Sequence, residues 1–246
     1  MNEQFQPVSN TPPSGLAGKL KFYGRMLLDL QILTIFRDVK KTLPSFTGDV
    51  LDIGCGQSPY KFLLNKQHTR YFGIDIIEAT AFGYHNPDVT AFDGKNIPFE
   101  DQKFNAVICT EVLEHVQEYQ YLVNEIYRTT RPNADIIVTI PWSARYHYIP
   151  YDYFRYTPSS LKTIFGQFSQ VTIMPRGTDI AVIGSKIIVL FAAGLLPVKK
   201  WKYIFVPLYL ICLPLLVLAV AIAHLALLFG IGNEEDPLGY TIIIKK

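Results

Sequence analysis

Two glycines follow a short apolar run near residue 50, and their spacing suits ligand binding. Residues 50–59 read VLDIGCGQSP, so the run ends in a loop that contains Gly54 and Gly56. Glycines let the backbone turn tightly and let a ligand approach the main-chain N–H groups. Ser58 and Pro59 suit the N-cap and the first position of a helix. The pattern predicts a strand, loop and helix that bind a nucleotide-type ligand, with a plain tight turn as the alternative.

Carboxylates end the next two predicted strands. Asp75 closes residues 71–75 (YFGID), and Asp93 closes residues 91–93 (AFD). A carboxylate at the end of the second strand can reach ribose hydroxyl groups, and one at the end of the third can accept from an adenine amino group. Each acid alone would more often be a solvated loop residue. In this order after a glycine loop, they predict a ligand that contains adenosine.

The glycine loop distinguishes two such ligands. NAD binding favours G-x-G-x-x-G, whose third glycine starts the helix that receives the pyrophosphate, and here Pro59 occupies that position. S-adenosylmethionine (SAM) has no pyrophosphate. Asp52 can bind its ammonium group while free N–H groups of the loop bind its carboxylate. SAM is therefore the favoured cofactor, and an NAD-dependent oxidoreductase is the weaker alternative.

A second group of chemically capable residues follows the fifth predicted strand. Residues 141–157 are rich in aromatic rings and hydroxyl groups and contain His147 and Asp152. A general base that titrates near neutrality would help a hydroxyl acceptor lose its proton, and His147 is the first candidate, then His115. The alternatives are that the rings only pack the loop, that Arg155 pairs with Asp152, and that His115 makes a structural hydrogen bond.

Short apolar runs alternate with helical stretches after residue 48, and this alternation predicts an α/β fold with a parallel sheet covered on both faces. Strands are predicted at 49–53, 71–76, up to residue 93, 106–109, 135–140, 170–174 and 240–244. A turn-rich stretch separates the second strand from the third. Helices are predicted at 20–43, from residue 59 onward, at 119–130 and at 161–165.

The composition changes after residue 180. Residues 180–196 are nearly all apolar apart from Lys186, residues 199–202 read KKWK, and residues 203–231 form a long apolar run interrupted by two prolines and His224. One membrane crossing needs about 20 apolar residues, so this region is long enough to span a bilayer or to fold back within it. The alternative is a buried dimer interface.

Five motifs occur in order between residues 48 and 142. They are VLDIGCG at 50–56, GID at 73–75, Asp93 with IPF at 97–99, FNAVICTEVLEHV at 104–116 and RPN at 131–133. Together they resemble the class I SAM-dependent methyltransferases of the ubiquinone-biosynthesis type. Asn105 replaces the aspartate that is usual in that family, at a position that is not usually a direct ligand.

The resemblance implies a Rossmann-like sheet of seven strands in the order 3-2-1-4-5-7-6, with the seventh antiparallel and helices on both faces. It also implies a SAM site, in which Asp75 binds the ribose, Asp93 and Gly94 flank the adenine, and Thr110 and Glu111 line the pocket. The full set of predicted SAM-binding residues is Asp52, Gly54, Cys55, Gly56, Asp75, Ile76, Asp93, Gly94, Thr110 and Glu111. The predicted catalytic residues are His147, His115 and Asp152, and no metal is predicted.

The implied strand order constrains the apolar region. Strand seven must pair between strands five and six, so the region has to leave the sheet and return to the same side. One net crossing is excluded, and two crossings or a hairpin within one leaflet remain. The KKWK segment favours the hairpin, because lysine and tryptophan prefer the headgroup region. The predicted organisation is a mobile tail (1–19), a methyltransferase domain (20–180 with 237–246) and a hydrophobic membrane-associating insertion (181–236).

Composition and charge limit the classes of binding partner and the cellular compartment that the sequence predicts. The formal net charge of +2 is too small to indicate nucleic-acid binding, which needs a basic stripe. The three cysteines are far apart in the sequence, which favours a reducing compartment. The N-terminal residues are polar and lack the pattern of a secretory signal. These features predict a membrane-associated protein whose catalytic domain is cytoplasmic.

The predicted function is SAM-dependent methyl transfer to an amphipathic or lipid-linked small molecule, such as a quinone precursor or a membrane-borne glycan intermediate. The alternative is a membrane-anchored scaffold that binds SAM without turnover. The fold hosts many acceptors, so the sequence leaves the substrate and the oligomeric state open.

Overall fold

Seven strands form one sheet in the order β3-β2-β1-β4-β5-β7-β6, which confirms the predicted order. The computed structural model describes residues 10–76, 89–197 and 199–246. The predicted turn-rich stretch after the second strand lies mostly outside these residues. The strands are β1 (Gly48–Ile53), β2 (Thr69–Ile76), β3 (Val89–Phe92), β4 (Phe104–Thr110), β5 (Thr130–Pro141), β6 (Gln170–Arg176) and β7 (Gly239–Lys245).

The sheet is parallel except for β7, which is antiparallel to both β5 and β6. β6 therefore runs in the same direction as β5. The carboxyl ends of β1, β4, β5 and β6 consequently lie at one edge of the sheet, where ligands of open α/β sheets bind.

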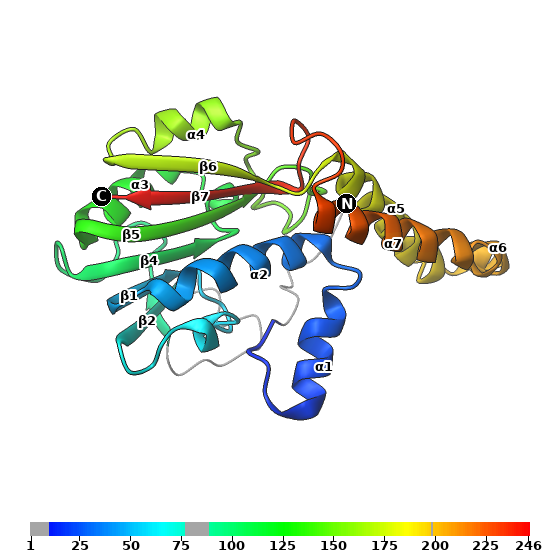
Figure 1. Ribbon diagram of the computed structural model, residues 1–246, viewed down its shortest axis with the longest axis horizontal. Coiled ribbons are helices and arrows are strands. Elements are labelled where there is room, and N and C mark those ends of the chain that lie inside the picture. Colours follow the sequence, from blue (N-terminus) through cyan, green and yellow to red (C-terminus); the bar gives the residue numbers. More distant parts are fainter. Residues whose placement is uncertain (1–9, 77–88, 198) are drawn as a thin grey trace.

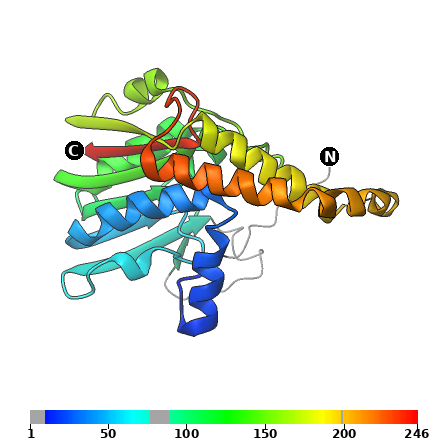
Figure 2. The ribbon, with the colours of Figure 1, turned by 45° about the vertical axis from the view of Figure 1, so that its right-hand side comes forward.

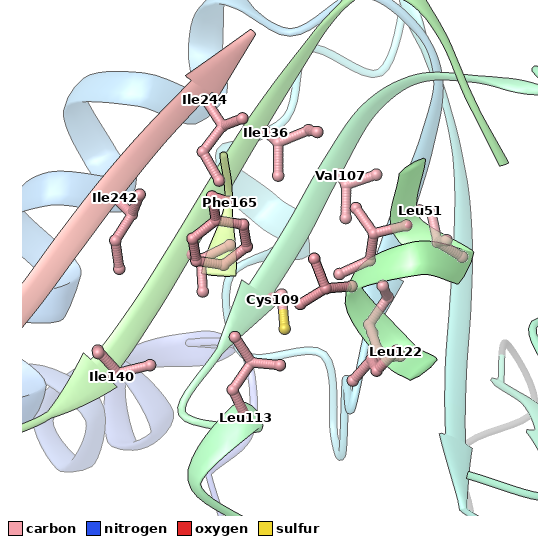
Figure 3. Packing of buried hydrophobic residues seen from close by; sticks show 14 of the residues in the cluster. Leu51, Val107, Cys109, Leu113, Leu122, Ile136, Ile140, Phe165, Ile242 and Ile244 are labelled. Atoms are coloured by element: carbon pink, nitrogen blue, oxygen red, sulfur yellow. The ribbon is translucent and has the colours of Figure 1, made fainter. Parts of the chain in front are cut away.

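Helices cover both faces of the sheet (Figure 1). Helix α2 (Leu30–Thr42) packs on one face, where its Ile35 and Val39 join Val50 and Ile108 in a buried cluster. Helices α3 (Tyr119–Thr129) and α4 (Pro158–Ile164) cover the opposite face. Neighbouring strand residues point to opposite faces, so each central strand contributes to both clusters. A second buried cluster lies on the face that α3 and α4 cover. Figure 3 shows part of it, including Leu51, Val107, Cys109, Leu122, Ile136 and Phe165.

The single helix predicted for residues 20–43 is wrong, because two helices form there. Helix α1 (Gly15–Arg25) ends in a turn, and α2 begins after Asp29, whose side chain accepts from Ile32 N at 3.1 Å. Arg25 adds an ion pair to Asp29 at 3.0 Å. The capping carboxylate restarts the helix in a new direction. Residues 15–19, expected to be part of a mobile tail, form the first turns of α1.

The helix predicted from residue 59 is also wrong. The only helical segment between β1 and β2 is a 3₁₀ turn, Lys61–Leu63. Ser58 has a φ of 54° and lies among turns, so it does not cap a helix. The carboxyl end of β1 therefore leads into an irregular loop.

The apolar region forms a helical hairpin between β6 and β7, in the place predicted for the insertion. Helix α5 (Asp179–Leu195) leaves the sheet, a 3₁₀ segment (Lys200–Phe205) and α6 (Val206–Ile211) form the tip, and α7 (Leu213–Phe229) returns. Figures 1 and 2 show α5 and α7 side by side, projecting away from the sheet. Among the described helices, none alone has the length and apolar composition of a membrane span. Helix α5 combined with residues 200–211 does, with a bend of 112° between them.

The base of the hairpin is narrow. Asp179 N donates to Asn233 O at 3.0 Å, and Asn233 N donates to Asp179 Oδ1 at 3.0 Å. Thr178 Oγ1 adds a bond to Ile231 O at 2.7 Å. We call this set of contacts the neck. It brings the two ends of the insertion together beside the sheet.

Candidate active site

The loop after β1 requires glycine for two reasons. Gly54 and Gly56 have φ values of 63° and 50°, a region that L side chains rarely adopt. A Cβ atom at Gly54 would also lie 2.5 Å from Cγ2 of Val112. Cys55 N donates to Ile74 O at 3.1 Å, which ties the loop to β2. The predicted loop residues are therefore held close to the ends of β2 and β4.

Asp52 is a buried carboxylate directly before this loop, with 4% of its surface exposed. Its Oδ2 atom lies 2.7 Å from the Tyr71 hydroxyl group, which also lies 2.8 Å from Ser58 Oγ. Burial raises the pKa of Asp52 to about 7, the charge of Asp75 adds to the increase, and the bond from Tyr71 opposes it. The ionised carboxylate of Asp52 would stabilise a cation placed beside it.

Asp75 joins the loop to the end of β2. Its two oxygens accept from Gly56 N and from Ile76 N, both at 2.8 Å. Burial raises the pKa of Asp75, although these two bonds oppose the increase. Ile76 is exposed, and a Cβ atom at Gly94 would lie 3.5 Å from its Cγ2. The predicted residues at the ends of β2 and β3 thus lie side by side.

Asp93 is exposed and organises the turn after β3. Its Oδ1 accepts from Lys95 N at 2.9 Å and from Asn96 N at 2.7 Å, and its Oδ2 accepts from the Asn96 side chain at 2.8 Å. These bonds lower the pKa of Asp93. Contact with an adenine amino group remains a prediction for this residue.

Thr110 and Glu111 lie at the end of β4, beside the loop. Glu111 has a φ of 54°, and its N–H donates to Thr139 O at 2.9 Å. Its carboxylate accepts from Nη2 of Arg176 at 2.8 Å, and the same nitrogen donates to Ile140 O at 2.8 Å. Arg176 is buried at the end of β6. Sequence reasoning missed this residue, because nothing in the sequence marks a strand-end arginine as the partner of a distant acid.

The rings of the two candidate histidines pack edge to face, with ring centroids 5.0 Å apart. His115 Nδ1 lies 2.6 Å from Tyr151 O, and His147 Nδ1 lies 2.9 Å from Arg145 O. Burial lowers the pKa of His115 to about 4, and the bond to Tyr151 opposes this shift. Because each Nδ1 faces a carbonyl oxygen, the proton of each neutral ring belongs on Nδ1 and the lone pair on Nε2.

Asp152 is occupied by structural partners. It makes a two-pronged ion pair with Arg155 at 2.6 and 2.8 Å, as in the alternative considered from the sequence, and it accepts from His147 N at 3.0 Å. Burial by itself would raise the pKa of Asp152, but the bonds from Arg155 and His147 outweigh it and the net shift is downward. Its Oδ2 also lies 3.1 Å from His147 Nδ1. The geometry suits a residue that orients His147.

Glu114 was not among the predicted site residues, yet its carboxylate lies beside His115. It is fully buried, and its Oε1 is 3.6 Å from His115 Nε2. Burial raises its pKa well above the usual range, and the charge of Glu111 adds to the increase. The adjacent His115 was the available sequence signal, since a carboxylate next to a histidine in a strand-end loop is a frequent feature of sites.

Comparison with known proteins identifies the central part of the chain. Residues 51–138 match the family described as "Methyltransferase domain". A probable S-adenosylmethionine-dependent methyltransferase of Mycolicibacterium smegmatis is 29% identical over 97 residues, which is 38% of this chain and 38% of that protein. An uncharacterized protein of Methanocaldococcus jannaschii is 30% identical over 122 residues, 48% of this chain and 53% of that protein. The chain thus spans about half or less of the length of these relatives.

Solved structures share the fold. A SAM-dependent methyltransferase from Archaeoglobus fulgidus has a TM-score of 0.53 at 20% identity, covering 92% of this chain and 99% of that one. Phosphoethanolamine N-methyltransferase 2 of Haemonchus contortus, solved with phosphomonomethylethanolamine and S-adenosylhomocysteine, has a TM-score of 0.51 at 16% identity, covering 87% and 52%. Together with the strand order, the matched domain supports a methyltransferase domain of the class I SAM-dependent type in the central part of this chain.

Proposed function

We propose that this protein transfers a methyl group from SAM to an amphipathic or lipid-linked small molecule at a membrane surface. When bound, SAM supplies a methyl group already activated on a positively charged sulfonium. The residues present fit such a cofactor: Asp52 and Asp75 place two carboxylates beside a loop that has no room for a side chain at Gly54. Much of the catalysis of such a transfer can come from positioning the two reactants.

The observation that carries the proposal is the attachment of the hairpin to the acceptor segment, residues 141–157. Lys186 Nζ on α5 donates to Ser143 O at 2.7 Å. Asp236, which follows α7, accepts from Trp142 Nε1 at 3.0 Å and from Ser143 Oγ at 3.2 Å. The hairpin therefore starts at the same edge of the sheet as the candidate histidines. A molecule held against its base has a short path to the site.

The hairpin has a large apolar surface without a partner in the described part of the chain. Its strongly exposed side chains, each more than half exposed, include Ile183, Leu190, Leu196, Trp201, Ile204, Leu208, Ile211, Leu215, Val217, Leu228 and Phe229. Apolar patches of this extent mark interfaces with proteins or membranes. Lys199, Lys200 and Lys202 lie at the tip and are exposed. Lysines beside apolar rings suit anionic headgroups, which favours a membrane over a second protein.

The tip also favours an orientation. Insertion of the hairpin tip-first would carry these lysines into the hydrocarbon, at a high cost in free energy. A hairpin lying along the membrane surface keeps the lysines among headgroups and the apolar side chains in the acyl region. We therefore infer a hairpin within one leaflet, with the catalytic domain on that side of the membrane.

The histidine pair offers a route for the acceptor proton. His147 is half-buried, and the lone pair on its Nε2 can accept a proton from a hydroxyl acceptor. Asp152 would stabilise the imidazolium that forms, since its Oδ2 lies 3.1 Å from Nδ1. His115 is the second candidate. An acceptor that is already ionised needs no such base.

Calorimetric titration of detergent-solubilised protein with S-adenosylhomocysteine (SAH) tests the cofactor. We expect binding that falls at least tenfold in Asp75→Ala, and no binding of NADH. Unaltered affinity in the variant would remove the assigned role of Asp75, and tight NADH binding would overturn the assignment of SAM. SAH binding with no methylated product from any lipid-extract fraction would favour the non-catalytic scaffold.

Flotation with vesicles tests the membrane. We expect the chain to float with vesicles that contain anionic lipid, and the double variant Ile204→Glu with Ile211→Glu to stay at the bottom, because two charges replace exposed apolar contacts at the tip. Tyr121→Glu, at a position on α3 that is also more than half exposed, is the matched control and should float. A wild-type chain that dimerises and does not float would show that the hairpin is a protein interface.

A further inference from the structure

We infer that Glu114, His115 and His147 form a binding site for one divalent transition-metal ion at the edge of the sheet where β4 and β5 end. One ligand atom from each of the three side chains lies within 4.8 Å of the others. Ligands around one ion with bonds of about 2.0 to 2.2 Å are separated by roughly 3 to 4 Å, so small side-chain shifts suffice. The three residues come from the loops after β4 and β5, at the edge of the sheet where ligands bind.

The histidines present the correct nitrogen atoms. His115 Nδ1 is held by Tyr151 O at 2.6 Å, and His147 Nδ1 by Arg145 O and Asp152 Oδ2 at 2.9 and 3.1 Å. Histidines that ligate metals almost always donate their other ring N–H to a carbonyl or carboxylate in this way. His115 Nε2 is buried and has no hydrogen-bond partner. The hydrogen bonds thus fix both rings with their lone pairs available.

Glu114 supplies the strongest argument. Its side chain is fully buried, and neither carboxylate oxygen has a hydrogen-bond partner. The nearby arginines already pair with other acids, Arg155 with Asp152 and Arg176 with Glu111. An ionised carboxylate that is buried without a partner is unfavourable, and such a group otherwise takes up a proton. A cation in contact with Glu114 would satisfy it in the ionised form.

The ligand set indicates the class of ion. Two imidazoles and one carboxylate suit Zn²⁺, Mn²⁺ or Fe²⁺ better than Mg²⁺ or Ca²⁺, which prefer oxygen ligands. Three protein ligands leave open positions for an acceptor oxygen. A hydroxyl group bound there loses its proton to water more readily, because the cation lowers its pKa. This role of the ion in activating the acceptor hydroxyl group rests on the proposed function. With His147 Nε2 bound to the ion, His147 would no longer be the base that takes the acceptor proton.

Metal binding can be measured without turnover. Protein stripped with a chelator is titrated with Mn²⁺ alone, with bound ion detected by electron paramagnetic resonance, and Zn²⁺ is tested by competition. We expect one site per chain, and at least tenfold weaker binding in Glu114→Gln and His147→Ala. His68→Ala and Glu118→Gln, at exposed positions outside the cluster, are the matched controls and should bind as the wild type does.

The melting temperature of Glu114→Gln provides a second test of the metal site. It removes a buried unpaired carboxylate, so the metal-free variant should melt at or above the temperature of the metal-free wild type, and Mn²⁺ should raise the melting temperature of the wild type only. SAH titration of each variant shows that the cofactor side is intact. SAH binding without metal binding, or equal losses in His68→Ala and His147→Ala, would overturn the metal site and leave the proposed function standing. A wild-type protein that does not bind SAH would instead contradict the proposed function.

Discussion

Asp52 illustrates how a single residue links burial to cofactor binding. Its raised pKa, about 7, means that the folded protein without cofactor holds a proton there that the unfolded chain releases near pH 4. The folded state therefore binds more protons than the unfolded state between these two values. By linkage, this group lowers the stability of the cofactor-free protein as pH rises from about 4 to 7.

The affinity for SAH should depend on pH through this residue. The ammonium group of the ligand favours the ionised carboxylate, so binding should strengthen as pH rises to about 7, by at most tenfold per pH unit, and then level off. Asp52→Asn should bind more weakly, with a flat profile over the same range, in calorimetric titrations. A profile with the same slope in the variant would show that another group is responsible.

Gly54 should tolerate no side chain. Gly54→Ala places a Cβ atom 2.5 Å from Val112 Cγ2 at a φ of 63°, so we expect a loss of roughly 1 to 3 kcal/mol of unfolding free energy. Gly24→Ala is the control, because a Cβ atom on this helical residue meets nothing within 4 Å and alanine favours the helix. Urea denaturation measures both variants. Equal stabilities would contradict the steric argument.

The elements show what the sequence could and could not predict. Apolar runs and strand-end acids predicted the core strands, and the family motifs implied the strand order, including the place of β7. The break between α1 and α2 was missed because apolar spacing continues through residues 26–28, while one capping carboxylate, Asp29, redirects the chain. The helix expected at Pro59 failed because Ser58 takes a left-handed turn. Both errors arise from the conformation or capping of a single residue, which the spacing of apolar residues does not indicate.

The sequence could propose candidate site residues where they follow strand ends, and it could not propose contacts that arise only through the fold. The glycine loop, Asp75 and the two histidines follow strand ends, and their roles remain predictions. Arg176 was not proposed, because its contact with Glu111 joins residues that are 65 positions apart. The sequence likewise could not show that Glu114 lacks a partner, because this depends on Arg155 and Arg176 pairing with other acids in the folded protein.

Arg176 links the ends of three strands, and its removal should be costly. Arg176→Met leaves the Glu111 carboxylate and the Ile140 carbonyl without their donor, so we expect a loss of about 3 to 5 kcal/mol of unfolding free energy. Adding Glu111→Gln should recover part of the loss, because it removes the unpaired charge. Thermal denaturation of the two variants measures this coupling, and additive losses would contradict it.

At the scale of the whole molecule, the neck makes the hairpin separable from the sheet. We expect a chain in which a short glycine–serine linker replaces residues 181–231 to fold and bind SAH, because Asp179 and Asn233 already lie within hydrogen-bonding distance. The loss of contacts to the buried Leu30 and Leu238 should cost about 2 to 5 kcal/mol. Vesicle flotation should be abolished. Flotation that persists would place membrane contact elsewhere in the protein.

The position of β7 has a consequence for the order of events during synthesis. β7 lies between β5 and β6, yet it follows both strands and the hairpin along the chain. The ribosome therefore releases α5, α6 and α7 while the edge of β5 is still open and β6 has no neighbour to pair with. If the hairpin binds a membrane as we propose, it would emerge for that contact before β7 completes the sheet. Under the proposed function, the arrival of β7 would then close the sheet beside that membrane.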